Sequence, residues 1–158
     1  MSRPLACKAK GEWAESAFLS RALRLGLVVS KPWGDNVPYD FAVEGRHGFR
    51  RVQVKSVWIM PRANRHGYEV NVGRPPHLRR IHTRLITGPR RHYSSRQVDL
   101  IAAYIVPKDA WYLIPIRALG RRTYIGLFPD QPRTTSRFGM TKGMGGPDRR
   151  VPTQAFCW

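Results

Sequence analysis

The apolar residues near the start of the chain recur at helical spacing. On a helical wheel of residues 10–25 they gather on one side, and Glu15 lies near the centre of that side. A carboxylate is costly to bury there unless it has a partner. Gly26 is suited to end the helix. We therefore expect an amphipathic helix that carries one acidic residue on its inward face. The apolar residues of that face are Phe18, Leu19, Ala22, Leu23 and Leu25.

The rest of the chain reads as short strands separated by turns. Residues 31–38 and 45–48 are rich in the turn formers Gly, Pro, Asp and Asn, and the runs between them favour strands. The order of a helix, a hairpin and further strands predicts an α/β fold, in which a mixed sheet is covered by the N-terminal helix. The expected strands are 27–30, 39–43, 49–58, 68–72, 98–106 and 111–116.

Two segments lack a clear periodic pattern. Residues 73–96 are rich in arginine and proline, which predicts a long basic loop with one short helix near residues 77–85. From Gly120 the apolar pattern fades. We expect one core domain over residues 1–120, followed by a basic C-terminal extension over residues 121–158.

Length and composition narrow the class of protein. The 158 residues are 42% hydrophobic, which suits one globular domain. No run approaches the roughly 18 apolar residues of a membrane span, and no export signal is recognisable. Cys7 and Cys157 lack a partner motif, so we interpret them as free thiols of a reducing compartment. These features predict a cytoplasmic protein with no membrane association.

The charge of the chain points to a polyanionic partner. Twenty-eight Lys and Arg stand against 10 acidic residues, a net charge of +18, and Glu69 is the single acid between residues 45 and 98. Such a surplus in a small domain is typical of nucleic-acid binding, and arginine suits phosphate contacts. A basic surface kept for solubility and an rRNA-associated protein remain alternatives.

One group of residues suggests chemistry. A hairpin of strands 39–43 and 49–58 would bring Asp40 beside Gln53 and Lys55, which share a sheet face because strand residues alternate. The carboxylate and the amide oxygen, with the Val54 carbonyl, can bind Mg²⁺ or Mn²⁺. Lys55 can stabilise charge on a phosphate or help deprotonate a nucleophile. Glu15 can reach the same cavity, where a metal would satisfy its charge.

Each of these residues also has an ordinary structural explanation. An Asp that opens a strand is commonly a turn residue, and Gln-x-Lys on an exposed strand is commonly only solvated. Glu15 could pair with an arginine. Ser56 could contact a phosphate or simply pack, and Trp58 could stack on a base but more often belongs to a core or its rim. The functional interpretation rests on the group as a whole.

The pattern Gly11-x-x-x-Glu15, Asp40 and Gln53-Val54-Lys55 resembles the PD-(D/E)XK nuclease superfamily. It is most similar to the homing endonucleases of bacterial group I introns, with Gln in place of the commoner Glu, and its opening resembles archaeal Holliday junction resolvases. The resemblance covers roughly residues 8–117. Within it, Val52–Ser56, Val98–Leu100 and Tyr112–Pro115 also match.

The resemblance implies a restriction-endonuclease-like core and a metal-dependent endonuclease of double-stranded DNA that works as a homo-oligomer. It implies that Glu15, Asp40, Gln53 and Lys55 form the active site, with the first three around Mg²⁺ or Mn²⁺. The alternative is an inactive nuclease fold that binds DNA or RNA. The expected contacts to the DNA backbone are Arg62, Arg65, Arg74, Arg79, Arg80 and Arg84.

Overall fold

The computed structural model describes residues 6–34, 36–46, 48–59, 67–74, 78–81, 84–129 and 141–143, with residues 78–81, 84–87 and 141–143 described by their backbone alone. The elements in chain order are α1 (Cys7–Arg24), β1 (Val29–Ser30), β2 (Phe41–Gly45), β3 (Gly48–Val57), β4 (Tyr68–Asn71), β5 (Leu78–Ile81), β6 (Arg84–Thr87), β7 (Leu100–Ile105), η1 (Val106–Lys108), β8 (Ala110–Pro115), α2 (Ile116–Leu119), β9 (Tyr124–Leu127) and β10 (Thr141–Gly143).

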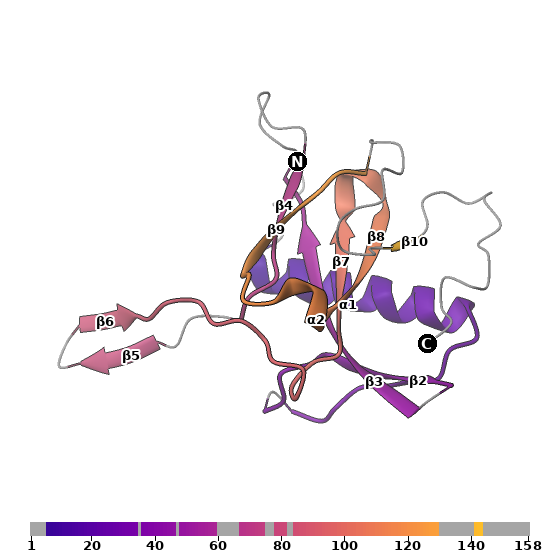
Figure 1. Cartoon of the computed structure of the whole chain (residues 1–158), viewed down its shortest axis with the longest axis horizontal. Helices are drawn as coiled ribbons and strands as arrows, with labels where there is room; N and C mark the ends of the chain where they lie inside the picture. Colours follow the sequence, from indigo (N-terminus) through magenta and orange to yellow (C-terminus); the bar gives the residue numbers. More distant parts are fainter. Residues whose placement is uncertain are drawn as a thin grey trace.

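A mixed sheet of order β1-β2-β3-β7-β8-β10 forms the centre of the fold, and α1 runs across one of its faces (Figure 1). Strands β3 and β7 pair in parallel, whereas the other neighbours in the sheet pair antiparallel. A parallel pair needs a long crossover, and here the segment between β3 and β7 carries β4, β5 and β6. The α/β architecture with an N-terminal helix on a mixed sheet confirms the sequence-based prediction.

Alternating residues of the central strands build two cores, one on each face of the sheet. On the α1 face, Val52 and Val54 of β3 pack with Ala14 and Phe18 of the helix. On the opposite face, β4, β9 and α2 cover the side chains of β7 and β8, such as Ile101. The period of two along β3 therefore separates Val54, which holds the helix, from Gln53 and Lys55.

The helix ends where the sequence predicts. Gly26 adopts a left-handed conformation with φ of 73°, and its N–H donates to Leu23 while the N–H of Leu27 donates to Ala22. This pair of bonds is the Schellman motif, which satisfies carbonyls that the helix leaves open. Of the expected apolar face, Phe18 and Ala22 are buried, but Leu23 is 56% exposed, so that part of the prediction was wrong.

The short helix expected near residues 77–85 is also wrong. Strands β5 and β6 form an antiparallel hairpin there, with Leu78 opposite Thr87 and Ile81 opposite Arg84. Figure 1 shows this hairpin projecting away from the sheet. The register leaves two residues between the strands, a length typical of tight hairpins. The β-branched residues in the segment favour strands, and prolines on both sides isolate it from the neighbouring elements.

Two further strands come from the segment beyond residue 120. β9 pairs with β4, and its Leu127 lies in the core on the face opposite α1. β10 pairs with β8 and extends the central sheet by one strand. Short strands such as these have weak patterns of their own, because the pairing partner is distant in the sequence. Within the described ranges, no helix is long and apolar enough to cross a membrane, and Cys7 is a free thiol.

An ion pair between Arg51 and Asp99 connects β3 to the start of β7. The Arg51 guanidinium donates from Nε to Asp99 Oδ2 and from a terminal nitrogen to Oδ1, both at 3.0 Å, and the Arg51 N–H also donates to Oδ2. The remaining guanidinium donors reach the carbonyls of Ser95 and Arg96. Asp99 is 25% exposed, and its hydrogen bond from Arg51 lowers the pKa of the carboxyl. The pair therefore fixes the crossover where the parallel strands meet.

Replacing Asp99 with Asn is expected to destabilise the protein by about 2 kcal/mol at neutral pH, because a charged acceptor of several bonds is lost. This corresponds to a melting temperature lower by roughly 4–8 °C. Because the folded pKa is lowered, the contribution of Asp99 is present above the unfolded pKa of about 3.9 and disappears as the pH falls through the folded value. Thermal unfolding over a series from neutral pH to about pH 2 tests this; a gap between the two proteins that does not narrow as the pH falls would contradict it.

Candidate active site

The site lies at the edge of β3, at the point where β2 begins. Asp40 immediately precedes β2, and its N–H still donates to the Val52 carbonyl at 2.9 Å. Two residues further along β3, the Asp40 side chain replaces the backbone of the neighbouring strand: its Oδ2 accepts the Val54 N–H at 2.7 Å. The start of β2 therefore leaves a notch beside β3, and the carboxylate of Asp40 lies in it.

Gln53 lies opposite Asp40, as the hairpin register requires. In this antiparallel register Phe41 pairs with Val52, so Asp40, just before Phe41, faces Gln53, just after Val52. The Gln53 amide donates from Nε2 to Asp40 Oδ2 at 2.5 Å, and the same nitrogen lies 3.4 Å from the Val54 carbonyl oxygen. The amide therefore reaches the Asp40 carboxylate and the Val54 carbonyl, two of the oxygens that the sequence suggests as cation ligands. In this arrangement its NH₂ group, rather than its oxygen, faces the carboxylate.

Lys55 extends from the same strand face and is largely enclosed by its neighbours. Its ammonium lies over the buried Tyr93 ring, 5.6 Å from the ring centroid. Burial lowers the pKa of Lys55, with the charge of Arg90 acting in the same direction and Asp40 opposing both. A lysine with a lowered pKa is closer to releasing its proton at neutral pH than an ordinary surface lysine. Burial also raises the pKa of Tyr93 to about 12, so its phenol is neutral beside the ammonium.

Glu15 approaches from the opposite side of the notch, on α1. Its Oε2 accepts a hydrogen bond from the Lys31 ammonium at 2.9 Å, and its side chain is 25% exposed against 62% for Lys31. This hydrogen bond raises the pKa of Lys31. The sequence predicted a partner for Glu15 from its place on an apolar helix face. Lys31 supplies that partner from the loop after β1.

The two carboxylates of the site influence each other. Burial raises the pKa of Asp40, and the negative charge of Glu15 acts in the same direction; the bonds from Val54 and Gln53 and the charge of Lys55 oppose the rise. The anionic form of Asp40 is therefore only partly compensated. Among the residues that the structure describes, no three His, Cys, Asp or Glu side chains gather. A cation here would bind to two carboxylates and neutral oxygens.

The structure places the four predicted site residues around one notch, but it tests few of the predicted DNA contacts. Arg62 and Arg65 lie outside the described residues. Arg79, Arg80 and Arg84 belong to the projecting β5–β6 hairpin, of which the structure describes only the backbone. Arg74 is half-buried, and its backbone pairs with that of Arg91 in an isolated antiparallel β-bridge. Its positive charge lowers the pKa of Tyr93, against the larger effect of burial.

Sequence reasoning missed Lys31 and Tyr93 as neighbours of the site. Lys31 lies in a turn-rich loop without periodicity, so nothing in the sequence links it to Glu15. Tyr93 follows the arginine-rich segment, where no periodic pattern marks it, and the structure buries it beside Lys55. A clue existed in the inward placement of Glu15, because a buried acid requires a basic partner.

Comparison with known proteins confirms the resemblance seen in the sequence. The sequence model of a family described as PD-(D/E)XK endonuclease matches residues 5–142. The fold is similar to a solved structure titled "The structure of a bacterial homing endonuclease: I-Ssp6803I", with a TM-score of 0.57, 21% sequence identity, and coverage of 96% of this chain and 86% of that chain. None of the curated proteins matches the chain.

Proposed function

Because the chain belongs to the PD-(D/E)XK endonuclease family, we propose that it is a metal-dependent endonuclease that hydrolyses phosphodiester bonds of double-stranded DNA. The observation that carries the proposal is the notch where Asp40 accepts hydrogen bonds from Gln53 and Val54, with Lys55 beside it. A protein that only bound nucleic acid would gain no stability from these coupled carboxylates, because burial and Glu15 both disfavour ionised Asp40.

The notch suits a hard divalent cation. Its candidate ligands are the carboxylates of Asp40 and Glu15, the Val54 carbonyl and the Gln53 amide oxygen, and a cation would offset the repulsion between the two acids. Magnesium takes one or two protein carboxylates and keeps several waters, which this set allows. Gln53 must turn its amide so that the oxygen faces the notch. A bound Mg²⁺ or Mn²⁺ would supply Lewis-acid stabilisation of charge on the phosphate.

Lys55 is the residue placed to act on the phosphate or on the attacking water. As an ammonium it would stabilise the negative charge that develops on the phosphate oxygens. With its pKa lowered by burial, it could alternatively accept a proton from the water. Asp40, which acts as an anion in either case, must lose its proton first, so activity should fall in acid as this carboxyl becomes protonated.

We further propose a site-specific, homing-type enzyme that acts as a homo-oligomer. The solved structure with a similar fold is titled as a homing endonuclease, and such enzymes need long sites with extended contacts. The net charge of +18 and the many arginines in residues 73–96 suit contacts to the backbone of a long duplex.

Incubating the protein with supercoiled plasmid tests the proposal. We expect relaxed and linear DNA to appear with Mg²⁺ or Mn²⁺ and to be absent with a chelator in excess. Binding measured by mobility shift without the cation serves as the control, since it reports folding and DNA affinity independently of cleavage. A protein that binds duplex DNA but leaves it intact under both cations is an inactive nuclease fold, and the proposal fails.

A further inference from the structure

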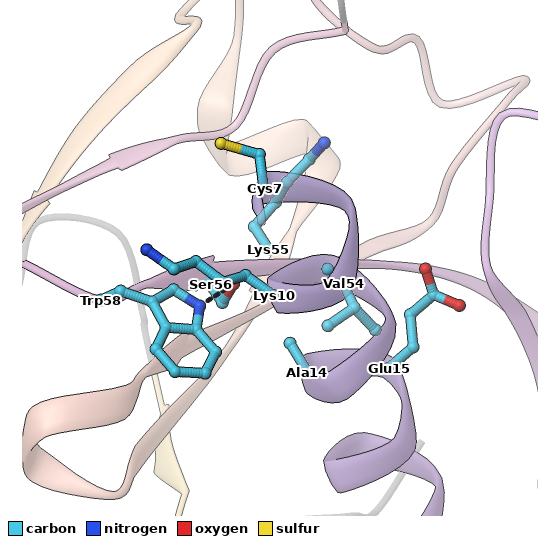
Figure 2. Close-up of a pocket in the computed structure, with 9 residues that line it drawn as sticks. Cys7, Lys10, Ala14, Glu15, Val54, Lys55, Ser56 and Trp58 are labelled. Atoms are coloured by element: carbon cyan, nitrogen blue, oxygen red, sulfur yellow. Dashed lines mark hydrogen bonds between the residues drawn. The ribbon is translucent and has the colours of Figure 1, made fainter. Parts of the chain in front are cut away.

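A cavity of about 290 Å³ opens between the first turns of α1 and the end of β3 (Figure 2). Glu15, Val54 and Lys55 form its border with the candidate active site. The other side of the cavity is formed by residues to which the proposed reaction gives no role. These residues are Cys7, Lys10, Gly11, Ala14, Ser56 and Trp58.

Gly11 lines this cavity from within the second turn of α1. Glycine inside a helix is destabilising relative to alanine, because it has more conformational freedom to lose. No neighbour requires it, since a Cβ at this position would meet no atom within 4 Å among the described residues. Gly11 lies one turn before Glu15, on the same side of the helix. The missing side chain therefore keeps open the space beside the active site.

Two donors face this space from the side opposite Glu15. Ser56 accepts the Trp58 indole N–H at 3.0 Å, so its own hydroxyl hydrogen is available to another acceptor. The Lys10 ammonium lies 5.6 Å from the centre of the Trp58 ring. Trp13 packs edge-on against that ring at 5.0 Å, which holds it in place. Figure 2 shows Lys10 and Trp58 on one side of the cavity and Glu15 on the other.

We infer that this cavity binds a second phosphate of the DNA strand that is cut, next to the phosphate that is attacked. Lys10 and Ser56 donate to the phosphate oxygens, and the sugar–phosphate chain passes over Gly11. A cation and a hydroxyl donor on a partly apolar surface fit a phosphodiester, which carries one charge and a sugar on each side. The inference rests on the proposed function, because it assigns a subsite to the same active site.

Filling the space above Gly11 is the first test. Gly11→Ala should raise the melting temperature by roughly 1–4 °C, because the helix gains a better former. Gly11→Leu should also fold, and we expect it to weaken binding of a random-sequence duplex about tenfold, since a bulky side chain would displace the strand by an ångström or more. A Gly11→Leu protein that melts no lower than the wild type and binds DNA equally well would overturn the inference.

The second test uses a matched pair of lysines on α1. Lys10→Ala should reduce the slope of the logarithm of DNA affinity against the logarithm of salt by roughly one, as expected for a lost phosphate contact. Lys8 lies two residues away, is 90% exposed and pairs only loosely with Glu12, at 3.9 Å. Lys8→Ala removes the same charge outside the cavity and should leave the slope unchanged. Equal slopes for the two variants would contradict the inference.

Cys7 supplies a readout that does not depend on cleavage. In a Cys157→Ser protein, Cys7 is the one remaining thiol of the chain, and it is exposed at the cavity. Without divalent cation, a duplex at about ten times its dissociation constant should slow Cys7 alkylation roughly tenfold. If the protein binds DNA without cutting it, the proposed function fails but this measurement still decides the subsite. Unchanged alkylation at saturating duplex would rule the subsite out.

Discussion

Substituting Lys55 by alanine is expected to lower the rate of plasmid cleavage by about 10²–10⁴-fold, the range for loss of a proton-transferring or charge-stabilising group. DNA affinity should change far less, because Lys55 is one of 28 Lys and Arg. The protein should still fold, because burying the Lys55 ammonium is unfavourable, as its lowered pKa indicates, and alanine removes that cost. Single-turnover cleavage with saturating protein measures the loss, and a mobility shift measures binding.

The conservative variant separates the two roles of this lysine. Lys55→Arg keeps a positive charge but cannot give up a proton at neutral pH. Activity within about tenfold of the wild type would assign Lys55 to stabilising charge on the phosphate, whereas a loss as large as in Lys55→Ala would indicate proton transfer. Lys8→Ala, which removes an exposed lysine that does not line the cavity beside the notch, is the control for charge alone. Full cleavage by Lys55→Ala would show that the site has been assigned to the wrong residue.

The central hairpin could be predicted from the sequence because its signals are local. Val52, Val54 and Val57 favour a strand, and the glycines at 45 and 48 favour a turn; the structure pairs Gly45 with Gly48. Once that turn is fixed, the register follows, and it brings Asp40 opposite Gln53. A slip of one residue would have turned Gln53 and Lys55 toward the helix. The site geometry therefore depended on one short turn that the sequence marks clearly.

The elements that the sequence did not reveal depend on distant partners. Strand β9 has only four residues, and its role comes from pairing with β4 more than 50 positions earlier. Neither strand has enough pattern to specify the other. The same holds for Lys31 and Glu15, which meet because the loop after β1 returns to α1. Local propensity identifies strands and turns, but it does not show which polar side chains the tertiary structure brings together.

The location of the site at a strand edge explains how residues of both sheet faces reach it. Val54 and Ser56 face α1, whereas Gln53 and Lys55 face the other side. In the centre of a sheet these two sets would be separated by the backbone. At the notch, β7 still pairs with one side of β3, but the pairing with β2 on the other side ends at Val52, and Asp40 bonds the Val54 N–H directly. Ser56 on the α1 face of β3 and the Asp40 carboxylate, which lies opposite Gln53, can therefore lie around the same phosphate.

Replacing Gln53 with Glu should couple protein stability to divalent cations more strongly than in the wild type. Without cation, the new carboxylate would face Asp40 Oδ2, which now accepts a hydrogen bond from the Gln53 amide at 2.5 Å. Losing a bond to a charged group costs about 1–3 kcal/mol, and the two like charges add to that cost. We expect the melting temperature at neutral pH to fall by roughly 3–10 °C.

Adding Mg²⁺ should reverse this loss, because the same exchange supplies a third carboxylate to the cation. The concentration of Mg²⁺ that gives half-maximal stabilisation should be at least about tenfold lower than in the wild type, which corresponds to 1.4 kcal/mol of binding free energy. Lowering the pH should also relieve the destabilisation, since one of the facing carboxylates then takes up a proton. Differential scanning fluorimetry over a series of cation concentrations and pH values measures each effect.

Gln97→Glu provides the matched control, because it adds the same charge in the turn before β7. There the side-chain oxygen of Gln97 accepts the Ser94 N–H, an interaction that a carboxylate keeps. We expect this variant to melt within about 2 °C of the wild type and to respond to Mg²⁺ as the wild type does. If Gln53→Glu behaves like Gln97→Glu, the notch beside Asp40 holds no cation, and the assignment of Gln53 as a ligand is wrong.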